Sequence, residues 1–304
     1  MRIKITLASN SSGSIDCNYQ HQIQAVIYGF LARSNPDYAA WLHEQGYLYK
    51  KEQRFKLFVF SGITFHGSIK IRKSNDSNSF SFHGSSRNPF LMSFQIASPV
   101  DKFIQGLIEG IFQEGQETRL GTQIFSVYQV ETLPNPFDCL NSLNGSSGLD
   151  SLNCLNGLDR LNGLNGSNSS LYLNLQPLES PLFIKKPMPA GVQDLYLFPG
   201  DDGYEAYVNR NLLNKYETLY GQSYTGDVLT FHFHEKQGKS VKQFTIFKKG
   251  KSGNLLPVHI KGTLQPFTVK GPGVLIKIGL ECGFGQNNSM GCGYVGLAQT
   301  DRTV

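Results

Sequence analysis

The order of amphipathic patterns in the first 135 residues restricts the fold of this chain more than any other feature. Residues 2–8 alternate apolar and polar positions, as a strand with one buried face does. Residues 21–34 instead repeat apolar positions at steps of three and four, which is the spacing of a helix. The later patterns are a short helix at 36–46, strands at 55–63, 66–73 and 89–97, a helix at 99–115 and a strand at 123–133.

Local signals place the helix boundaries in this block. Asn35 is suited to cap the short helix, and Pro36 suits its first turn. Gly46 is suited to end it. Phe103, Leu107 and Ile111 lie on one face of the later helix, so we expect that face to be buried.

A second block repeats the theme less regularly. A helix is predicted at 204–221, and strands are predicted at 170–175, 181–186, 227–235, 242–249, 257–269 and 273–281. Between the blocks, residues 139–175 repeat Leu-Asn-Gly with Ser and Asp between the copies. This composition indicates a flexible or weakly ordered insertion that the protein does not need.

The two patterned blocks predict an α+β fold of two tandem ferredoxin-like units, because strand, helix, two strands, helix, strand is the βαββαβ order of that unit. We expect an N-terminal unit at 1–135, the low-complexity insertion at 136–175 and a C-terminal unit at 176–304. A glycine-rich loop belongs to the C-terminal unit.

Composition and charge narrow the classes of function. The net charge is +5, which permits a polyanionic partner without requiring one. The five cysteines have no C-x-x-C spacing, so the sequence predicts neither a zinc site nor a disulfide framework. We see no signal peptide and no apolar run of membrane-spanning length, and we expect a cytoplasmic protein with no membrane partner and no metal or other cofactor.

Basic residues are clustered near aromatic residues. One cluster contains Lys50, Lys51, Arg54 and Lys56, and another contains Lys70, Arg72 and Lys73. A third runs from Lys236 to Lys251 around Phe244 and Phe247, and includes Lys242, Lys248 and Lys249. Such residues keep sheet edges soluble, and they also suit a phosphate backbone with unstacked bases.

The segment "CGFGQNNSMGCG" at 282–293 contains four glycines in twelve residues. No lysine follows the glycines as in a P-loop, and no helical pattern follows as in a dinucleotide-binding fold. One interpretation is a glycine-rich hairpin between two strands. The other is a loop whose bare backbone N–H groups bind phosphates, with Gly283, Gly285, Gln286, Asn287, Ser289, Gly291 and Gly293 as the RNA-binding residues.

The motif "GFGQNNSMGCGYV" resembles the glycine-rich signature of the CRISPR-associated endoribonucleases that cut precursor CRISPR RNA within its repeats. These enzymes belong to the repeat-associated mysterious protein superfamily, which is built on ferredoxin-like units. The stretches "IQAVIYGFLARSNPDYAAWLHEQGY", "FKLFVFSGI", "LESPLFIKK" and "NLLNKYETLYG" resemble further parts of the family in the right order. The resemblance therefore covers both blocks and leaves out only the insertion.

The resemblance implies a metal-independent cut in which the 2′-hydroxyl of the RNA attacks the adjacent phosphate. The products are a 2′,3′-cyclic phosphate and a 5′-hydroxyl. It assigns the catalytic roles to His43, Tyr28 and Lys56, with Lys50 and Lys51 as alternatives for the lysine. The family often has a lysine where this chain has Asn287.

The chemistry of these side chains agrees with the roles. Histidine titrates near neutral pH and is suited to remove or deliver a proton. A lysine stabilises charge that develops on the phosphate, and a tyrosine orients by its hydroxyl. Each residue also has an ordinary structural interpretation: His43 as a surface histidine, Tyr28 as part of the core and Lys56 as a solvated strand residue.

Three hypotheses follow. The first is the repeat-cleaving endoribonuclease, with CRISPR repeat RNA as its partner. The second is a relative that binds CRISPR repeat or guide RNA without cutting it, and the third is a ferredoxin-like binding module without a nucleic-acid partner. A homodimer and an association with other CRISPR effector subunits are left open.

Overall fold

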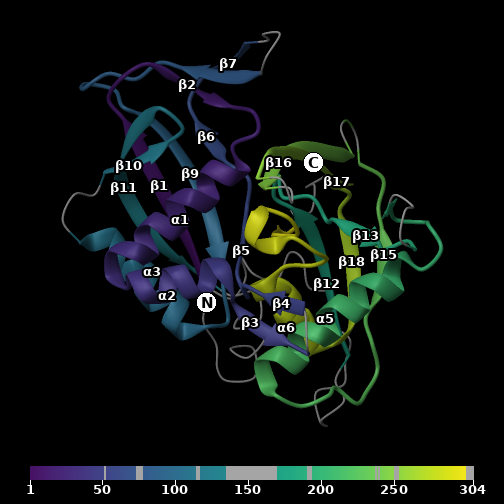
Figure 1. The fold of residues 1–304 in the computed structure, drawn as a ribbon. Coiled ribbons are helices and arrows are strands. Elements are labelled where there is room, and N and C mark those ends of the chain that lie inside the picture. The colour runs from purple at the N-terminus through teal and green to yellow at the C-terminus, as the bar shows by residue number, and fades with distance from the viewer. Residues whose placement is uncertain are drawn as a thin grey trace, which may run out of the picture.

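The computed structural model describes residues 1–50, 53–72, 78–113, 117–134, 170–189, 194–236, 238, 240–249 and 253–298 of the chain. Within these ranges the chain forms an α+β fold of helices and antiparallel sheets, as predicted. Two halves lie side by side, one coloured purple to blue and the other green to yellow in Figure 1. None of the helices in this part of the chain has the length and apolar character needed to cross a membrane.

The N-terminal half is built on a six-stranded sheet with the order β10-β11-β1-β9-β5, in which β6 also pairs with β9. Its strands are β1 (Arg2–Ser9), β5 (Val59–Phe60), β6 (Thr64–His66), β9 (Phe90–Ala97), β10 (Glu117–Leu120) and β11 (Gln123–Leu133). The register places Ile5 of β1 between Val130 of β11 and Phe94 of β9. The first strand of this half therefore lies in the middle of its sheet.

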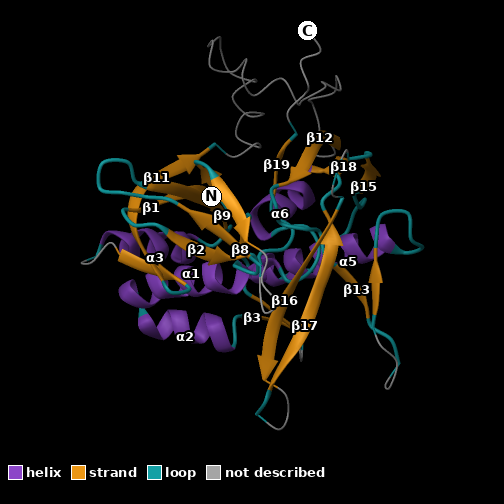
Figure 2. Cartoon of the chain, turned by 90° about the horizontal axis from the view of Figure 1, so that it is seen from above, coloured by secondary structure: helices purple, strands orange, loops and turns teal. Residues whose placement is uncertain are grey.

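Helices α1 (Gln20–Ser34), α2 (Pro36–Glu44) and α3 (Asp101–Phe112) lie on one side of this sheet (Figure 2). The predicted boundary signals are confirmed. The Asn35 side chain accepts a hydrogen bond of 2.9 Å from the Tyr38 N–H, and Pro36 begins α2. Gly46 follows the helix with a φ of 69°, and its N–H donates to the Trp41 carbonyl. The apolar face predicted for α3 is buried.

The C-terminal half has a four-stranded sheet with the order β15-β18-β12-β19, and its first strand is again central. Its strands are β12 (Ser170–Pro177), β15 (Thr230–Phe233), β18 (Phe267–Pro272) and β19 (Val295–Leu297). Helices α5 (Tyr204–Tyr220) and α6 (Gly273–Cys282) pack with this sheet. Strand β12 takes in the last residues of the segment that the sequence assigned to the insertion, and residues 135–169 lie outside the described residues.

Smaller sheets of two or three strands are added to both halves. Strands β2 (Gly13–Asp16), β7 (Ile69–Arg72) and β8 (Ser79–Phe82) form one sheet, and β3 (Tyr47–Tyr49) pairs with β4 (Gln53–Phe55). In the C-terminal half, β13 (Ile184–Lys186) pairs with β14 (Leu195–Leu197), and β16 (Val241–Lys249) pairs with β17 (Leu255–Thr263). The β16–β17 pair extends away from the sheet as a two-stranded arm (Figure 2).

Three strand predictions were wrong. Residues 257–269 belong to two strands of different sheets, β17 and β18. Residues 273–281 form helix α6 instead of a strand, and seven residues of this helix are buried, among them Ile276, Ile278 and Leu280. A short helix that is buried on most sides has a mostly apolar sequence, and periodicity cannot distinguish it from a buried strand. Residues 55–63 contain the last residue of β4 and the two-residue strand β5, because Leu57 has a φ of 53°, which interrupts extended backbone.

Polar contacts of Arg2 and Lys242 connect the two halves. The Arg2 guanidinium donates to the Tyr294 hydroxyl at 3.0 Å and to the Val295 carbonyl at 2.5 Å. The Lys242 ammonium donates to the Glu179 carbonyl at 2.7 Å and to the Tyr19 hydroxyl at 3.3 Å. Lys242, which the sequence placed in a basic cluster, therefore joins the arm to the N-terminal half.

Candidate active site

Helices α1 and α2 bring Tyr28 and His43 into contact. Their ring centroids are 5.0 Å apart and their planes lie at 84°, so one ring edge faces the other ring. His43 is exposed in the last turn of α2, whereas Tyr28 is partly buried and also contacts Phe58. Burial raises the pKa of the Tyr28 hydroxyl, so this group keeps its proton at neutral pH and is available as a hydrogen-bond donor.

Lys56 reaches the same place from the chain between β4 and β5. Its ammonium donates to the backbone carbonyls of Leu42 and His43, the latter at 2.7 Å. These carbonyls belong to the last turn of α2, where a cation is favourable because no helical N–H follows. Burial, and then the charge of Arg54, lower the pKa of Lys56. The structure thus brings together Tyr28, His43 and Lys56.

The glycine-rich loop of the C-terminal half lies beside this group. The Gln24 side chain donates to the Ser289 carbonyl at 2.8 Å, and Gln24 lies one helical turn before Tyr28 on α1. The loop connects α6 to β19 and contains a short 3-10 helix, η3 (Asn288–Met290). It is not the hairpin between two strands that one interpretation of the sequence offered.

The glycines of this loop are required by contacts within the protein. Gly283, Gly285, Gly291 and Gly293 are buried and have positive φ values of 85°, 77°, 83° and 82°. A Cβ atom on Gly285 would lie 2.7 Å from the Phe183 carbonyl oxygen, and one on Gly293 would lie 2.0 Å from the Phe284 carbonyl oxygen.

The N–H groups of this loop are also used internally. Those of Phe284, Gln286 and Gly293 donate to the carbonyls of Gly293, Phe183 and Pro181. These internal contacts favour a structural role for the glycines, and their contact with phosphate stays a prediction.

A buried lysine holds the first part of the loop. Lys215 of α5 is 1% exposed, and its ammonium donates to the Gly283 carbonyl at 2.6 Å and to the Gly285 carbonyl at 3.0 Å. Burial lowers the pKa of Lys215 to about 7. The sequence analysis missed this residue. The available signal was its place on the apolar face of the helix, in register with Val208 and Leu212, which are fully buried.

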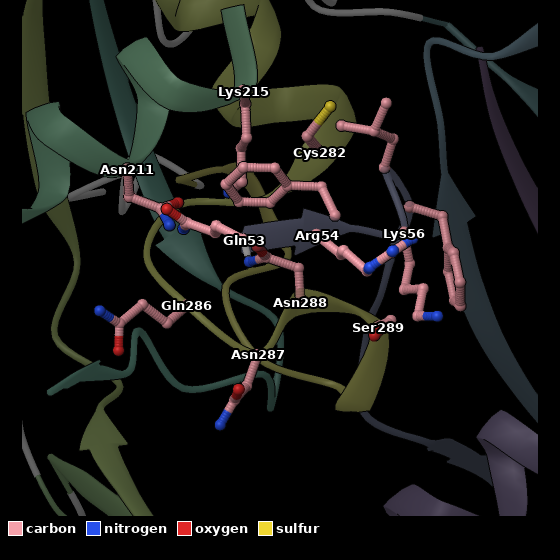
Figure 3. Close-up of a pocket in the computed structure, with 13 residues that line it drawn as sticks. Gln53, Arg54, Lys56, Asn211, Lys215, Cys282, Gln286, Asn287, Asn288 and Ser289 are labelled. Carbon is pink, nitrogen blue, oxygen red and sulfur yellow. The ribbon is translucent and has the colours of Figure 1, made fainter. Parts of the chain in front are cut away.

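A pocket of about 330 Å³ opens between β4, α5 and the loop (Figure 3). Lys56 and Ser289 line one side of it, and Asn211 and Lys215 reach in from α5 on the other. The complete lining is Gln53, Arg54, Phe55, Lys56, Leu57, Phe58, Asn211, Lys215, Cys282, Gln286, Asn287, Asn288 and Ser289. This set has three basic side chains, those of Arg54, Lys56 and Lys215, and no carboxylate, so the pocket favours an anionic ligand.

Some predicted RNA-binding residues have other partners or positions. The exposed Lys50 lies 3.7 Å from Glu217, and the Gln286 side chain exchanges hydrogen bonds of 3.1 and 3.2 Å with the backbone of Lys185. Asn287 has a left-handed φ of 57° on the pocket rim.

For three further predicted RNA-binding residues, the structure describes the backbone alone or nothing. Lys51 lies outside the described residues. The backbone of Lys248 and Lys249 belongs to the outer end of the arm, whereas their side chains lie outside the description. Within the described part of the chain, no three His, Cys, Asp or Glu side chains are grouped so as to hold a metal ion.

Comparison with known proteins gives one consistent result over both halves. Residues 14–131 match the family described as CRISPR-associated protein Cas6, N-terminal, and residues 172–297 match CRISPR associated protein Cas6, C-terminal. A curated relative is the CRISPR-associated endoribonuclease Cas6 1 of Methanocaldococcus jannaschii, which is 24% identical over 307 residues. That alignment covers 97% of this chain and 92% of the relative.

Solved structures agree with the sequence matches. One described as CRISPR associated protein Cas6 is 25% identical, with a TM-score of 0.63 over 98% of this chain and 99% of the other. The product of a Cas6-related gene from Pyrococcus furiosus has a TM-score of 0.65 over 99% of each chain. It is 18% identical, so that likeness concerns the fold alone.

Proposed function

The chain belongs to the Cas6 family of CRISPR-associated endoribonucleases, and from this premise we propose that it cuts precursor CRISPR RNA within its repeats without a metal ion. In the proposed reaction the 2′-hydroxyl oxygen attacks the adjacent phosphorus and the bond to the 5′-oxygen breaks. The products are a 2′,3′-cyclic phosphate and a 5′-hydroxyl. One proton leaves the 2′-hydroxyl and one is added to the departing 5′-oxygen.

The contact between Tyr28 and His43 is the observation that carries this proposal. His43 is exposed to a substrate and exchanges a proton with one of the two reacting oxygens. The Tyr28 hydroxyl, kept protonated by burial, donates a hydrogen bond that orients the RNA. Lys56 uses two of its three N–H donors on the end of α2, and its charge beside His43 stabilises the reacting phosphate.

We further propose that Arg54, Asn287 and Ser289 contact the RNA next to this group, because they line the pocket that Lys56 also lines. Lys50, Lys51, Lys248 and Lys249 remain proposed phosphate contacts along a longer path. The buried glycines contribute by allowing the loop its shape rather than by touching phosphate. The solved relative described as an RAMP protein binding different RNA substrates agrees with an RNA-binding role for the fold.

We interpret the two halves as ferredoxin-like units, and we move the start of the second unit from 176 to Ser170, because β12 is the first strand of its sheet. The insertion is then 136–169. The shared strand order supports this interpretation, because in each sheet the first strand lies between the last strand and the strand that directly precedes α3 or α6. The two Cas6 matches, at 14–131 and 172–297, leave this insertion unmatched.

Incubation of the purified chain with a labelled repeat RNA in the presence of a chelator tests the proposal. We expect cleavage at one site with a 2′,3′-cyclic phosphate on the upstream product. Binding without cleavage would instead support the alternative of a non-cleaving CRISPR RNA-binding protein. If the chain neither binds nor cleaves the RNA, the result would indicate a ferredoxin-like module without a nucleic-acid partner.

A further inference from the structure

Two asparagines of helix α5 are equally buried but differ in their hydrogen bonds. Asn209 and Asn211 each expose 7% of their surface. The Asn209 amide donates to the Leu229 carbonyl at 2.8 Å and accepts from the Leu229 N–H at 3.0 Å. The Asn211 Oδ1 atom is buried and has no hydrogen-bond partner within the described structure. Because an unpaired buried amide oxygen is unfavourable, this atom calls for a donor that the chain does not supply.

Asn211, whose Oδ1 atom is unpaired, lines the pocket of about 330 Å³ described above. Asn211 lies one helical turn before Lys215 on α5, and both point into the pocket from the same side (Figure 3). Arg54 and Lys56 contribute positive charge from the N-terminal half. A ligand that pairs with both the basic side chains and the Asn211 oxygen needs a negative charge and an N–H donor on the same molecule.

A nucleotide of RNA has both groups. Its phosphate is anionic, and the edge of each RNA base carries an N–H donor that a protein can read when the base is unstacked. The pocket volume of about 330 Å³ lies at the lower end of the range of small-molecule sites. Lys56 lines the pocket and also contacts the His43 carbonyl, so an occupant would lie next to the proposed cleavage site.

We propose that this pocket binds one unstacked nucleotide of the RNA, whose base donates to Asn211 Oδ1 while its phosphate faces Arg54 and Lys56. The assignment rests on the proposed function and adds a specificity-determining residue to it. Each base carries its N–H donor at a different position on its edge, so the fixed Asn211 Oδ1 atom favours the base whose donor reaches it, and affinity depends on which base occupies the pocket.

The test compares N211L with N209L by thermal unfolding and by fluorescence anisotropy with labelled oligo(A), oligo(C) and oligo(U) RNAs. All chains carry H43A so that the RNA stays intact. Leucine has a similar size and no polar atom, so N211L removes an unpaired oxygen and should keep or raise the Tm. Its affinity for the preferred RNA should fall about tenfold, and its preference among the three RNAs should weaken.

N209L is the matched control, because it removes an equally buried amide that has two backbone partners. It should lower the Tm and leave the RNA affinity of the folded protein unchanged. N211A, which only removes atoms, is measured beside N211L. A Tm that falls in both Asn211 variants would overturn the proposal, because it would show that the amide already has a structural role.

Equal RNA affinity of N211L and its parent would also overturn the proposal that this pocket binds a nucleotide. The proposed RNA cleavage would then stand without the pocket. If neither these three RNAs nor the labelled repeat RNA binds the parent, the RNA-binding function itself fails, and the pocket assignment fails with it.

Discussion

At the scale of single residues, the proposed chemistry depends on one exposed imidazole beside a partly buried tyrosine ring. The 5.0 Å contact places Tyr28 and His43 at one point of the surface, and Lys56 contacts the backbone of His43 from the other side. Substitution of these residues is expected to remove different functions. His43 is proposed to transfer a proton, whereas Tyr28 is proposed to orient the substrate by its hydroxyl.

H43A should slow cleavage by roughly 10²-fold or more and change RNA affinity little, because it removes a proton-transfer group that holds no phosphate. Y28F should slow it less, since only the hydroxyl is lost, and K56A should slow cleavage and weaken binding. Single-turnover cleavage and equilibrium binding of the same labelled RNA measure the two effects separately.

H43A cleaving at the wild-type rate would show that the active site lies elsewhere. If K50A or K51A proved more damaging than K56A, only the choice of lysine would change.

Lys215 predicts a pH dependence of stability. In the folded chain its pKa is lowered to about 7, so it loses its proton from about pH 7 upward, whereas the unfolded chain keeps that proton until near the usual lysine value. The unfolded state then binds more protons, and the free energy of unfolding rises with pH by up to about 1.4 kcal/mol per unit. The gain is absent below about pH 7, where both states are protonated.

Urea unfolding of the wild-type chain and of K215M between about pH 7 and pH 9 measures this effect. From about pH 8.5 upward the buried Cys282 thiol, whose pKa is raised to about 12, contributes in the opposite direction, because the unfolded chain then loses the thiol proton first. K215M should show a flatter rise with pH than the wild type. Parallel curves would mean that Lys215 keeps its charge in the folded protein over this range.

At the scale of elements, the glycine-rich loop is held by the C-terminal half that contains it. Lys215 of α5 binds two of its carbonyls, and the backbone of residues 181–183 accepts two of its N–H groups. The loop therefore has a fixed shape before any RNA binds. Its edge toward α1, at Ser289, is the part that approaches the Tyr28 and His43 pair.

G285A should destabilise the chain by about 2 kcal/mol or more, because alanine must adopt a positive φ and also meets the Phe183 carbonyl. G221A is the matched control: Gly221 ends α5 with a φ of 68° and has open space around it, so only the backbone cost of about 1 kcal/mol applies. Chemical denaturation of both variants measures the difference. A fully stable G285A that no longer binds RNA would restore the interpretation in which phosphate approaches this glycine.

At the scale of the whole molecule, both halves contribute basic side chains to one pocket. Arg54 and Lys56 come from the N-terminal half and the buried Lys215 from the C-terminal half, in a chain with a net charge of +5. Contacts between the halves, such as those of Arg2 with Tyr294 and of Lys242 with Tyr19, keep the two halves in place around this pocket. RNA binding should therefore be dominated by phosphate contacts that span the two halves.

RNA affinity should fall steeply with salt concentration, and R54A should reduce the slope of log affinity against log salt by about one phosphate contact. R119A serves as the control, because Arg119 is exposed on β10 at the opposite edge of the N-terminal sheet from β5. Titrations at several salt concentrations give the slopes. A flat response in the wild type, or equal slopes for R54A and R119A, would contradict the proposed RNA path.

Local patterns were sufficient for the features that depend on neighbouring residues. Asn35, Pro36 and Gly46 mark the ends of α2, because capping and positive φ are local properties. The family resemblance singled out Tyr28 and His43, which lie on two helices separated only by Asn35.

The features that depend on distant residues required the folded chain. Helix α6 was predicted as a strand because its surroundings, rather than its own periodicity, bury it. Lys215 contacts glycines 68 and 70 positions away, and the unpaired oxygen of Asn211 is recognised only once its neighbours are in place. Unlike the burial of an apolar helix face, the partners of a buried lysine and an unpaired hydrogen-bonding group result from the packing of the whole chain, so no local pattern in the sequence reveals them.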